Sequence, residues 1–133
     1  MTLSQVEYEF FEYEDPSSTA TELDRQIKLR FSDASVLYVS WTSGRQHGPD
    51  DQPYSIGFRD FSYCSAEPAF VVDASNSPMW SKHIGRTLEL AYTPASAVEL
   101  GFQVLELRSG TNCIFLSSLG TDSIRISDAA PNP

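Results

Sequence analysis

Apolar and polar residues alternate with a period of two over several short stretches of this chain. Near its start, Val6, Tyr8 and Phe10 alternate with Glu7 and Glu9. This alternation predicts a β-strand with one apolar and one solvent-facing side, because successive side chains of a strand point to opposite faces. Similar stretches, rich in β-branched and aromatic residues and bounded by Gly, Pro, Ser and Asp, follow along the chain. They are residues 27–31, 36–41, 56–61, 87–92, 105–108, 113–117 and 123–128.

The alternation of the first strand changes phase at the pair Phe10-Phe11. Beyond this pair, Phe11 and Tyr13 are the apolar positions, and Glu12 and Glu14 are the charged ones. A shift of one residue exchanges the two faces of a strand, so the change of phase predicts a β-bulge or a bend.

Two parts of the chain, approximately residues 6–61 and 87–128, carry similar strands in the same order. For example, Ile-Lys-Leu-Arg at residues 27–30 resembles Leu-Glu-Leu-Arg at residues 105–108. We therefore expect a single all-β domain over residues 1–133, built from two similar four-stranded halves by internal duplication. About eight strands around one core fit a closed barrel or a two-sheet sandwich, and the periodicity leaves both open.

One short helix, at about residues 78–84, is expected between the two halves. Ser77 suits the N-cap, Pro78 suits the first helical position, and Gly85 suits a left-handed residue that ends the helix. A helix of two turns is marginal by itself, so packing of Trp80 has to hold it. A hairpin is expected earlier, where residues 32–34 form the turn between two strands.

The chain is acidic, with 18 Asp and Glu residues, 9 Lys and Arg residues and a formal net charge of −9. Nucleic acids and anionic membranes are bound through basic surfaces, so this charge argues against both as partners. The first 24 residues contain acidic side chains and no Lys or Arg. An acidic strand there would attract a protein with a basic surface. The residues expected to contact this partner are Glu7, Glu9, Glu12 and Glu14, with Tyr8 and Tyr13 as aromatic anchors.

The loop at residues 42–53 is about eight residues longer than the corresponding connection in the second half. Long loops on a rigid β-scaffold often carry function, so an enzyme acting through this loop is one alternative. Its polar candidates are Arg45, His47, Asp50 and Asp51. These residues lack the spacing of a zinc or calcium site, and the chain shows no hydrolase, phosphate-binding or dinucleotide motif. We therefore expect no metal, no cofactor and no assigned catalytic residue.

A second alternative is a barrel that encloses a small ligand. Trp41, Trp80 and Tyr38 are the candidates to line such a cavity, because aromatic side chains dominate ligand pockets. The first residues, MTLSQVEYEF, lack the basic and apolar regions of a secretory signal, which predicts a cytoplasmic protein. An unpaired strand at the edge of a sheet would also permit a homodimer.

The overall character of the chain resembles the small, acidic, cytosolic immunity-type β proteins of bacterial toxin systems. The segments that carry this resemblance are Thr-Asp-Ser-Ile-Arg-Ile-Ser-Asp at residues 121–128 and Ser-Pro-Met-Trp at residues 77–80, followed by Ile-Gly-Arg at residues 84–86. The resemblance implies a single-domain protein without catalytic machinery, and it assigns no individual residue. Together with the charge, it predicts a non-enzymatic protein-binding module, such as an immunity or inhibitor protein for a basic partner.

Overall fold

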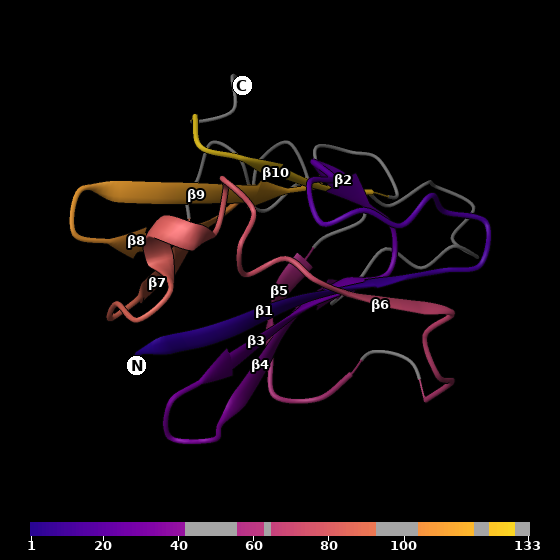
Figure 1. The fold of residues 1–133 in the computed structure, drawn as a ribbon, viewed down its shortest axis with the longest axis horizontal. Coiled ribbons are helices and arrows are strands. Elements are labelled where there is room, and N and C mark those ends of the chain that lie inside the picture. Colours follow the sequence, from indigo (N-terminus) through magenta and orange to yellow (C-terminus); the bar gives the residue numbers. More distant parts are fainter. Residues whose placement is uncertain (42–55, 63–64, 93–103, 119–122, 130–133) are drawn as a thin grey trace.

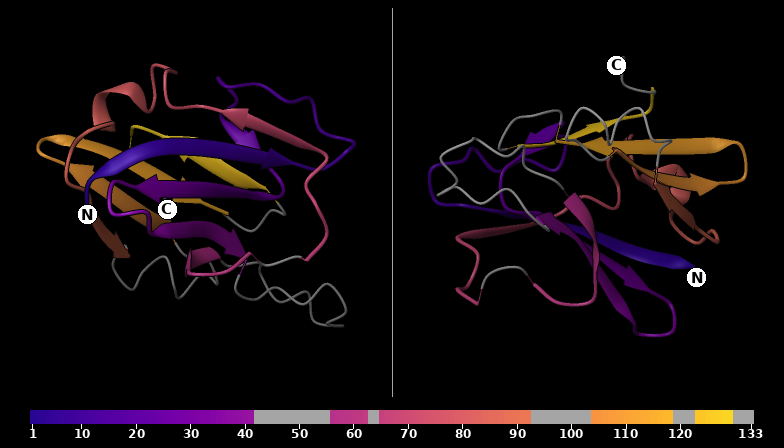
Figure 2. Two further views of the ribbon diagram at one scale, coloured as in Figure 1. Left: turned by 60° about the horizontal axis from the view of Figure 1, so that its bottom comes forward. Right: turned by 180° about the vertical axis from the view of Figure 1, so that it is seen from behind.

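The computed structural model describes residues 1–41, 56–62, 65–92, 104–118 and 123–129. Within these ranges the chain forms two five-stranded antiparallel sheets that lie face to face as a sandwich (Figure 1). The predicted all-β fold is confirmed, and the sandwich is the predicted architecture that is present. The sheets do not close into a barrel, because each has its own pair of edge strands. The view from behind in Figure 2 shows the same two layers.

The first sheet has the strand order β5-β4-β3-β1-β6. Four of its strands form an antiparallel meander, and the pairing of β3 with β4 confirms the predicted hairpin. The fifth strand, β6, was not predicted; it pairs with the other side of β1. The bounds are β1 (Leu3–Phe10), β3 (Gln26–Phe31), β4 (Val36–Trp41), β5 (Ile56–Arg59) and β6 (Phe70–Asp73).

The second sheet has the strand order β2-β10-β9-β8-β7. Its last four strands in the chain also form an antiparallel meander. The short strand β2 comes from the first half of the chain and pairs with β10. A common origin of the two meanders stays a prediction. The bounds are β2 (Glu22–Leu23), β7 (Glu89–Tyr92), β8 (Val104–Ser109), β9 (Asn112–Ser117) and β10 (Ile124–Ser127).

One buried apolar cluster holds the two sheets together. Along most strands its members alternate with residues that face away from the partner sheet, as the period of two requires. In β1 a register shift between Leu3 and Gln5 interrupts this alternation. Burying a large apolar side chain contributes about 1.5–3 kcal/mol relative to leaving it exposed. The largest fully buried side chains are Trp80, Tyr8, Phe10, Leu3, Leu23, Ile27, Leu29, Ile56, Leu105, Leu107, Ile114 and Leu116.

The short helix predicted at about residues 78–84 is present as a single 3-10 turn and not as two turns of α-helix. The segment contains only a 3-10 helix, η1 (Ser81–His83), and no α-helix occurs within the described ranges. The hydroxyl of Ser77 does not cap a helix but donates to the carbonyl of Ala74 at 2.8 Å. Gly85 does adopt the predicted left-handed conformation, with φ of 80°. No helix in the described part of the chain is long and apolar enough to cross a bilayer.

The change of phase after Phe10 marks the end of β1 and not a bulge. The backbone N–H of Glu14 donates to the carbonyl of Phe11 at 3.1 Å, which closes a turn. The chain then crosses to the second sheet as β2 and returns to the first sheet as β3. Only Asp24 and Arg25 separate these two strands, so both residues lie where the chain passes between the layers.

Candidate functional site

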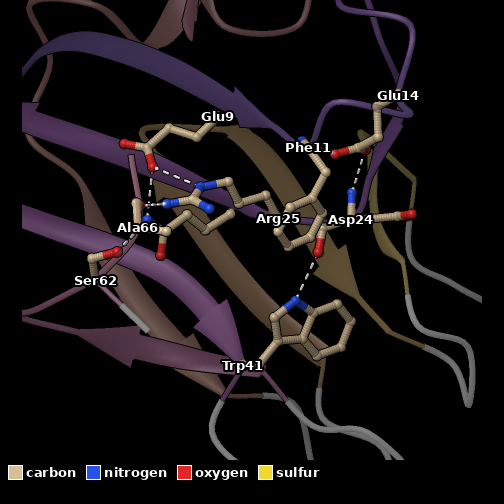
Figure 3. A network of polar contacts seen from close by, with 9 residues as sticks. Glu9, Phe11, Glu14, Asp24, Arg25, Trp41, Ser62 and Ala66 are labelled. Carbon is tan, nitrogen blue, oxygen red and sulfur yellow. Dashed lines mark hydrogen bonds and ion pairs between the residues drawn. The ribbon is translucent and has the colours of Figure 1, made fainter. Parts of the chain in front are cut away.

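The expected ribbon of exposed glutamates along β1 is wrong at Glu9, which is 7% exposed. Its Oε1 lies 3.4 Å from Nε of Arg25, whose side chain is also buried (Figure 3). The same oxygen accepts a hydrogen bond of 2.8 Å from Nε2 of Gln26. Glu9 does point away from the core, but Gln26 of the neighbouring strand lies opposite it in register. Distant residues also cover this end of the sheet, because Nη2 of Arg25 donates to the carbonyl of Ala66 at 2.6 Å.

Glu7 is likewise neutralised within the sheet. Its Oε1 lies 3.2 Å from Nη2 of Arg30 on the adjacent strand, and its side chain is mostly covered. Two of the four glutamates expected to face a partner therefore already have cationic neighbours. The cations come from β3 and the residue before it, where they face the same side of the sheet.

Tyr8 lies in the core and is not the surface anchor that the sequence predicted. It is an inward-facing residue of β1, and Nε1 of Trp80 donates to its hydroxyl at 2.6 Å. Burial raises the pKa of Tyr8 to about 12, although the hydrogen bond from Trp80 opposes this rise. Trp80, predicted to line a ligand cavity, is itself 0% exposed and belongs to the same apolar cluster.

The three predicted cavity residues do not line one cavity. Trp80 lies between the sheets, whereas Tyr38 lies on the outer face of the first sheet and lines a different pocket there. Trp41 is half-buried against the edge of the core, and its Nε1 donates to the carbonyl of Asp24 at 2.9 Å (Figure 3). The loop candidates Arg45, His47, Asp50 and Asp51 lie outside the described residues.

The segment that follows β1, residues 11–24, keeps an acidic surface; we call it the acidic segment. It contains five Asp and Glu residues and no Lys or Arg. Glu12, Asp15 and Glu22 are exposed, and Tyr13 is 70% exposed. Glu22 has the exposed Arg125 as a neighbour at 3.9 Å. Of the six predicted partner contacts, Glu12 and Tyr13 are thus the exposed ones.

Glu14 holds the acidic segment in shape from within. Its two carboxylate oxygens accept hydrogen bonds of 2.6 Å from the backbone N–H groups of Phe11 and Asp24 (Figure 3). Partial burial raises the pKa of the Glu14 carboxyl, while the two backbone hydrogen bonds act in the opposite direction. The rings of Phe11 and Tyr13 stack with their centroids 5.7 Å apart. The exposed tyrosine is therefore presented on an organised turn.

Asp24 connects the acidic segment to both sheets. Its Oδ2 accepts a hydrogen bond of 2.6 Å from the hydroxyl of Tyr13, and its Oδ1 accepts one of 2.5 Å from Ser123. Ser123 immediately precedes β10 in the second sheet, while Trp41 at the end of β4 binds the carbonyl of Asp24. Asp24 thus fixes the position of the segment relative to both layers.

One serine–histidine pair lies within hydrogen-bond distance. Nδ1 of His83 is 2.7 Å from Oγ of Ser109, but both residues are buried. Within the described ranges, Nε2 of His83 has no hydrogen-bond partner. A nucleophile must reach its substrate, so this buried pair is a packing contact and not a catalytic dyad.

Among the residues that the structure describes, no three His, Cys, Asp or Glu side chains are grouped as metal ligands would be.

Mixed charges line a pocket on the outer face of the first sheet, and this pocket was not predicted from the sequence. The pocket lies over β1, β3 and β4, beneath the segment that links β5 to β6. One feature of the sequence could have indicated this pocket. In β3, apolar residues alternate with Lys28 and Arg30, and these cations suit a position beside the glutamates of β1.

No family model matches the chain, and no curated protein or solved structure gives a significant match.

Proposed function

We propose that this protein is a non-enzymatic protein-binding module that uses the acidic segment to engage a basic partner, as an immunity or inhibitor protein does. The observation that carries the proposal is the presentation of Tyr13, which is 70% exposed although its turn is held by internal hydrogen bonds. An exposed aromatic side chain on an organised turn loses little conformational entropy on binding. Tyrosine is also among the residues that most often dominate the energy of a protein interface.

The charge around Tyr13 favours a basic partner. The exposed carboxylates of Glu12 and Asp15 lie in the same segment, and no lysine or arginine occurs within residues 11–24. Such a field raises the rate of encounter with a cationic protein and disfavours acidic ones. The proposed contact with the partner therefore lies in the acidic segment, which follows β1, and not on β1 itself.

Neither alternative function has comparable support. A ligand inside a closed barrel has no place in this fold, because the space between the sheets is occupied by the apolar cluster. An enzyme acting through residues 42–53 would depend on residues outside the described ranges. A cytoplasmic location and the absence of a cofactor remain part of the proposal.

The proposal is tested by capturing the partner from a lysate of the source cells on the immobilised protein at low ionic strength. The captured protein is then purified, and its association and dissociation rates are measured at low and physiological salt. We expect a basic protein whose association slows as salt rises, because screening weakens long-range attraction.

Two variants and one matched control locate the contact. Tyr13→Ala is expected to weaken binding by about tenfold or more, mainly through faster dissociation. Glu12→Lys with Asp15→Lys is expected to slow association by about tenfold at low salt. The control is Glu89→Lys with Asp128→Lys, which makes the same change of charge at an exposed residue of β7 and at the exposed residue that follows β10. Equal effects of both charge reversals would contradict the proposal that the acidic segment is the contact.

A further inference from the structure

The pocket on the outer face of the first sheet has a volume of about 350 Å³. This is near the lower end of the size range of small-molecule sites, which is roughly 300–1,000 Å³. Its floor is formed by Arg25 and by side chains of β1, β3 and β4. Its rim is formed by Ser62, by residues 65–68 and by Val71 of β6. In Figure 1 the described residues that follow β5 and those that precede β6 lie on the side of the first sheet that faces away from the second sheet. We call this hollow the outer pocket.

Most of the charges in the outer pocket are already paired. Arg25 lies against Glu9, and Arg30 lies against Glu7. Two charged residues of the pocket are outside these pairs. Lys28 lies on β3, between the two arginines in sequence, and Glu67 is exposed on the rim. The floor of the pocket therefore carries one positive charge in excess.

Lys28 has no carboxylate within 4.0 Å of its ammonium group among the residues that the structure describes. Its side chain is half-buried, and its Nζ lies 5.6 Å from the centroid of the Tyr38 ring. A cation over an aromatic face is stabilised modestly. An ammonium group offers three hydrogen-bond donors, so most of the binding capacity of Lys28 remains available to a ligand.

We infer that the outer pocket binds a small monocarboxylate, with the carboxylate on Lys28 and the apolar part of the ligand against Tyr38, Pro68 and Val71. A single negative charge matches the single unpaired positive charge on the floor. A dianion would place its second charge near Glu7 and Glu67, which like-charge repulsion disfavours. The aromatic and aliphatic side chains of the wall favour a ligand that also has an apolar group. This inference is independent of the acidic segment.

Phenylacetate is a suitable probe, and 2-phenylacetamide is its neutral counterpart. Titration of the ¹⁵N-labelled protein at low ionic strength is expected to give saturable shifts at Lys28, Tyr38 and Ser65 with phenylacetate. The amide is expected to give none, because it cannot form the charge-assisted hydrogen bond to Lys28. Equal shifts with both compounds, or shifts with neither, would overturn the inference.

Lys28→Met removes the ammonium group and keeps most of the apolar stem. It is expected to weaken phenylacetate binding by about tenfold or more, since a hydrogen bond between charged groups is lost. Lys82→Met is the matched control, because it makes the same change at an exposed lysine in η1. Equal weakening by both variants would show that the probe responds to net charge and not to the outer pocket.

A thermal melt of each variant distinguishes loss of the site from loss of the fold. Lys28→Met is also expected to bind the basic partner as the unmodified protein does, because Lys28 lies outside the acidic segment. Failure of the probe to bind and failure of the partner to bind are therefore separate results, and neither outcome implies the other.

Discussion

Nε1 of Trp80 donates a 2.6 Å hydrogen bond to the hydroxyl of Tyr8 at the centre of the apolar core. The two residues are 72 positions apart in the chain. Trp80 belongs to the segment that passes from β6 to β7, and Tyr8 belongs to the central part of the first sheet. Burying an indole N–H without a hydrogen-bond acceptor costs free energy of folding, so the hydroxyl of Tyr8 has a structural role. The sequence did not indicate this role, because Tyr8 lies between two glutamates.

Tyr8→Phe is expected to destabilise the protein by about 1–3 kcal/mol, because it leaves the indole N–H of Trp80 buried without an acceptor. Tyr92→Phe removes a hydroxyl from a tyrosine that is 55% exposed, and should change stability by less than about 0.5 kcal/mol. Urea denaturation followed by tryptophan fluorescence measures both. A Tyr8→Phe variant as stable as the Tyr92→Phe variant would contradict the role assigned to the hydroxyl.

Removing one partner of the Glu9–Arg25 pair is expected to cost more than removing both. Glu9→Gln leaves a buried guanidinium group without its carboxylate, which typically costs about 3–5 kcal/mol. The double variant Glu9→Gln with Arg25→Met should recover part of this loss, because it removes the buried charge as well. Denaturant unfolding of the two single variants and the double variant gives the coupling energy directly.

Glu22→Gln is the surface control for this pair. Glu22 and Arg125 are about half exposed and 3.9 Å apart, so the substitution should change stability by less than about 0.5 kcal/mol. Additive losses in the Glu9 and Arg25 variants, with no recovery in the double variant, would show that the two charges are not coupled.

Stability is expected to fall in mildly acidic solution because of His83. Burial, followed by the nearby charges of Lys82 and Arg86, lowers the pKa of His83 below its ordinary value of 6.5. The unfolded chain therefore binds a proton at a pH where the folded protein does not. Protonation thus favours unfolding below about pH 6.5, by at most about 1.4 kcal/mol per pH unit, until the lower folded pKa is passed.

His83→Gln should reduce this pH dependence, because the amide cannot take up a proton in this range. The variant still offers a polar group to Ser109, although its overall stability is expected to be lower. His47→Gln, which removes the other histidine of the chain, should retain the dependence. Unfolding free energies between pH 7.5 and pH 5, measured by urea titration, provide the comparison. An unchanged slope in His83→Gln would refute the assignment.

Ala34→Gly is expected to stabilise the protein slightly. Ala34 lies in the turn between β3 and β4 with φ of 73°, a left-handed conformation that costs an L-residue roughly 1–2 kcal/mol. Glycine avoids this strain but loses more backbone entropy on folding, so a net gain of about 0.5 kcal/mol is expected. Ala91→Gly, at an exposed position of β7, should instead destabilise by about 0.5–1 kcal/mol. Thermal unfolding of both variants measures the difference.

Local signals in the sequence predicted the local features of this structure. The hairpin at residues 32–34 and the left-handed conformation of Gly85 depend on a few neighbouring residues, and both are present. The helix expected just before Gly85 is limited to one 3-10 turn for a non-local reason. Trp80 enters the core between the sheets, and Ile84 adopts an extended conformation that ends the 3-10 turn.

The candidate site was only partly predictable, because the surroundings of a strand's outer face are set by distant residues. The alternation in β1 correctly placed Glu9 on the side of the sheet away from the core. At Glu9, however, that side is not exposed to solvent. Arg25 neutralises Glu9, Gln26 donates a hydrogen bond to it, and residues near Ala66 cover it. The strand β2 escaped prediction because it has only two residues, and β6 escaped because its sequence, Phe-Val-Val-Asp, does not alternate apolar with polar residues. Both acquire their pairing from strands far away in the chain, β10 and β1.

The sequence by itself determined the all-β class, the positions of most strands and the acidic character of the chain. These properties follow from the alternation of neighbouring residues and from a sum over side chains, neither of which depends on how the chain is arranged in space. The tertiary structure alone decided that the sheets form a sandwich, that Tyr8 is core and that Lys28 lies on the floor of a pocket. Each of these depends on contacts between strands and segments far apart in the chain, whose pairing a local pattern does not specify.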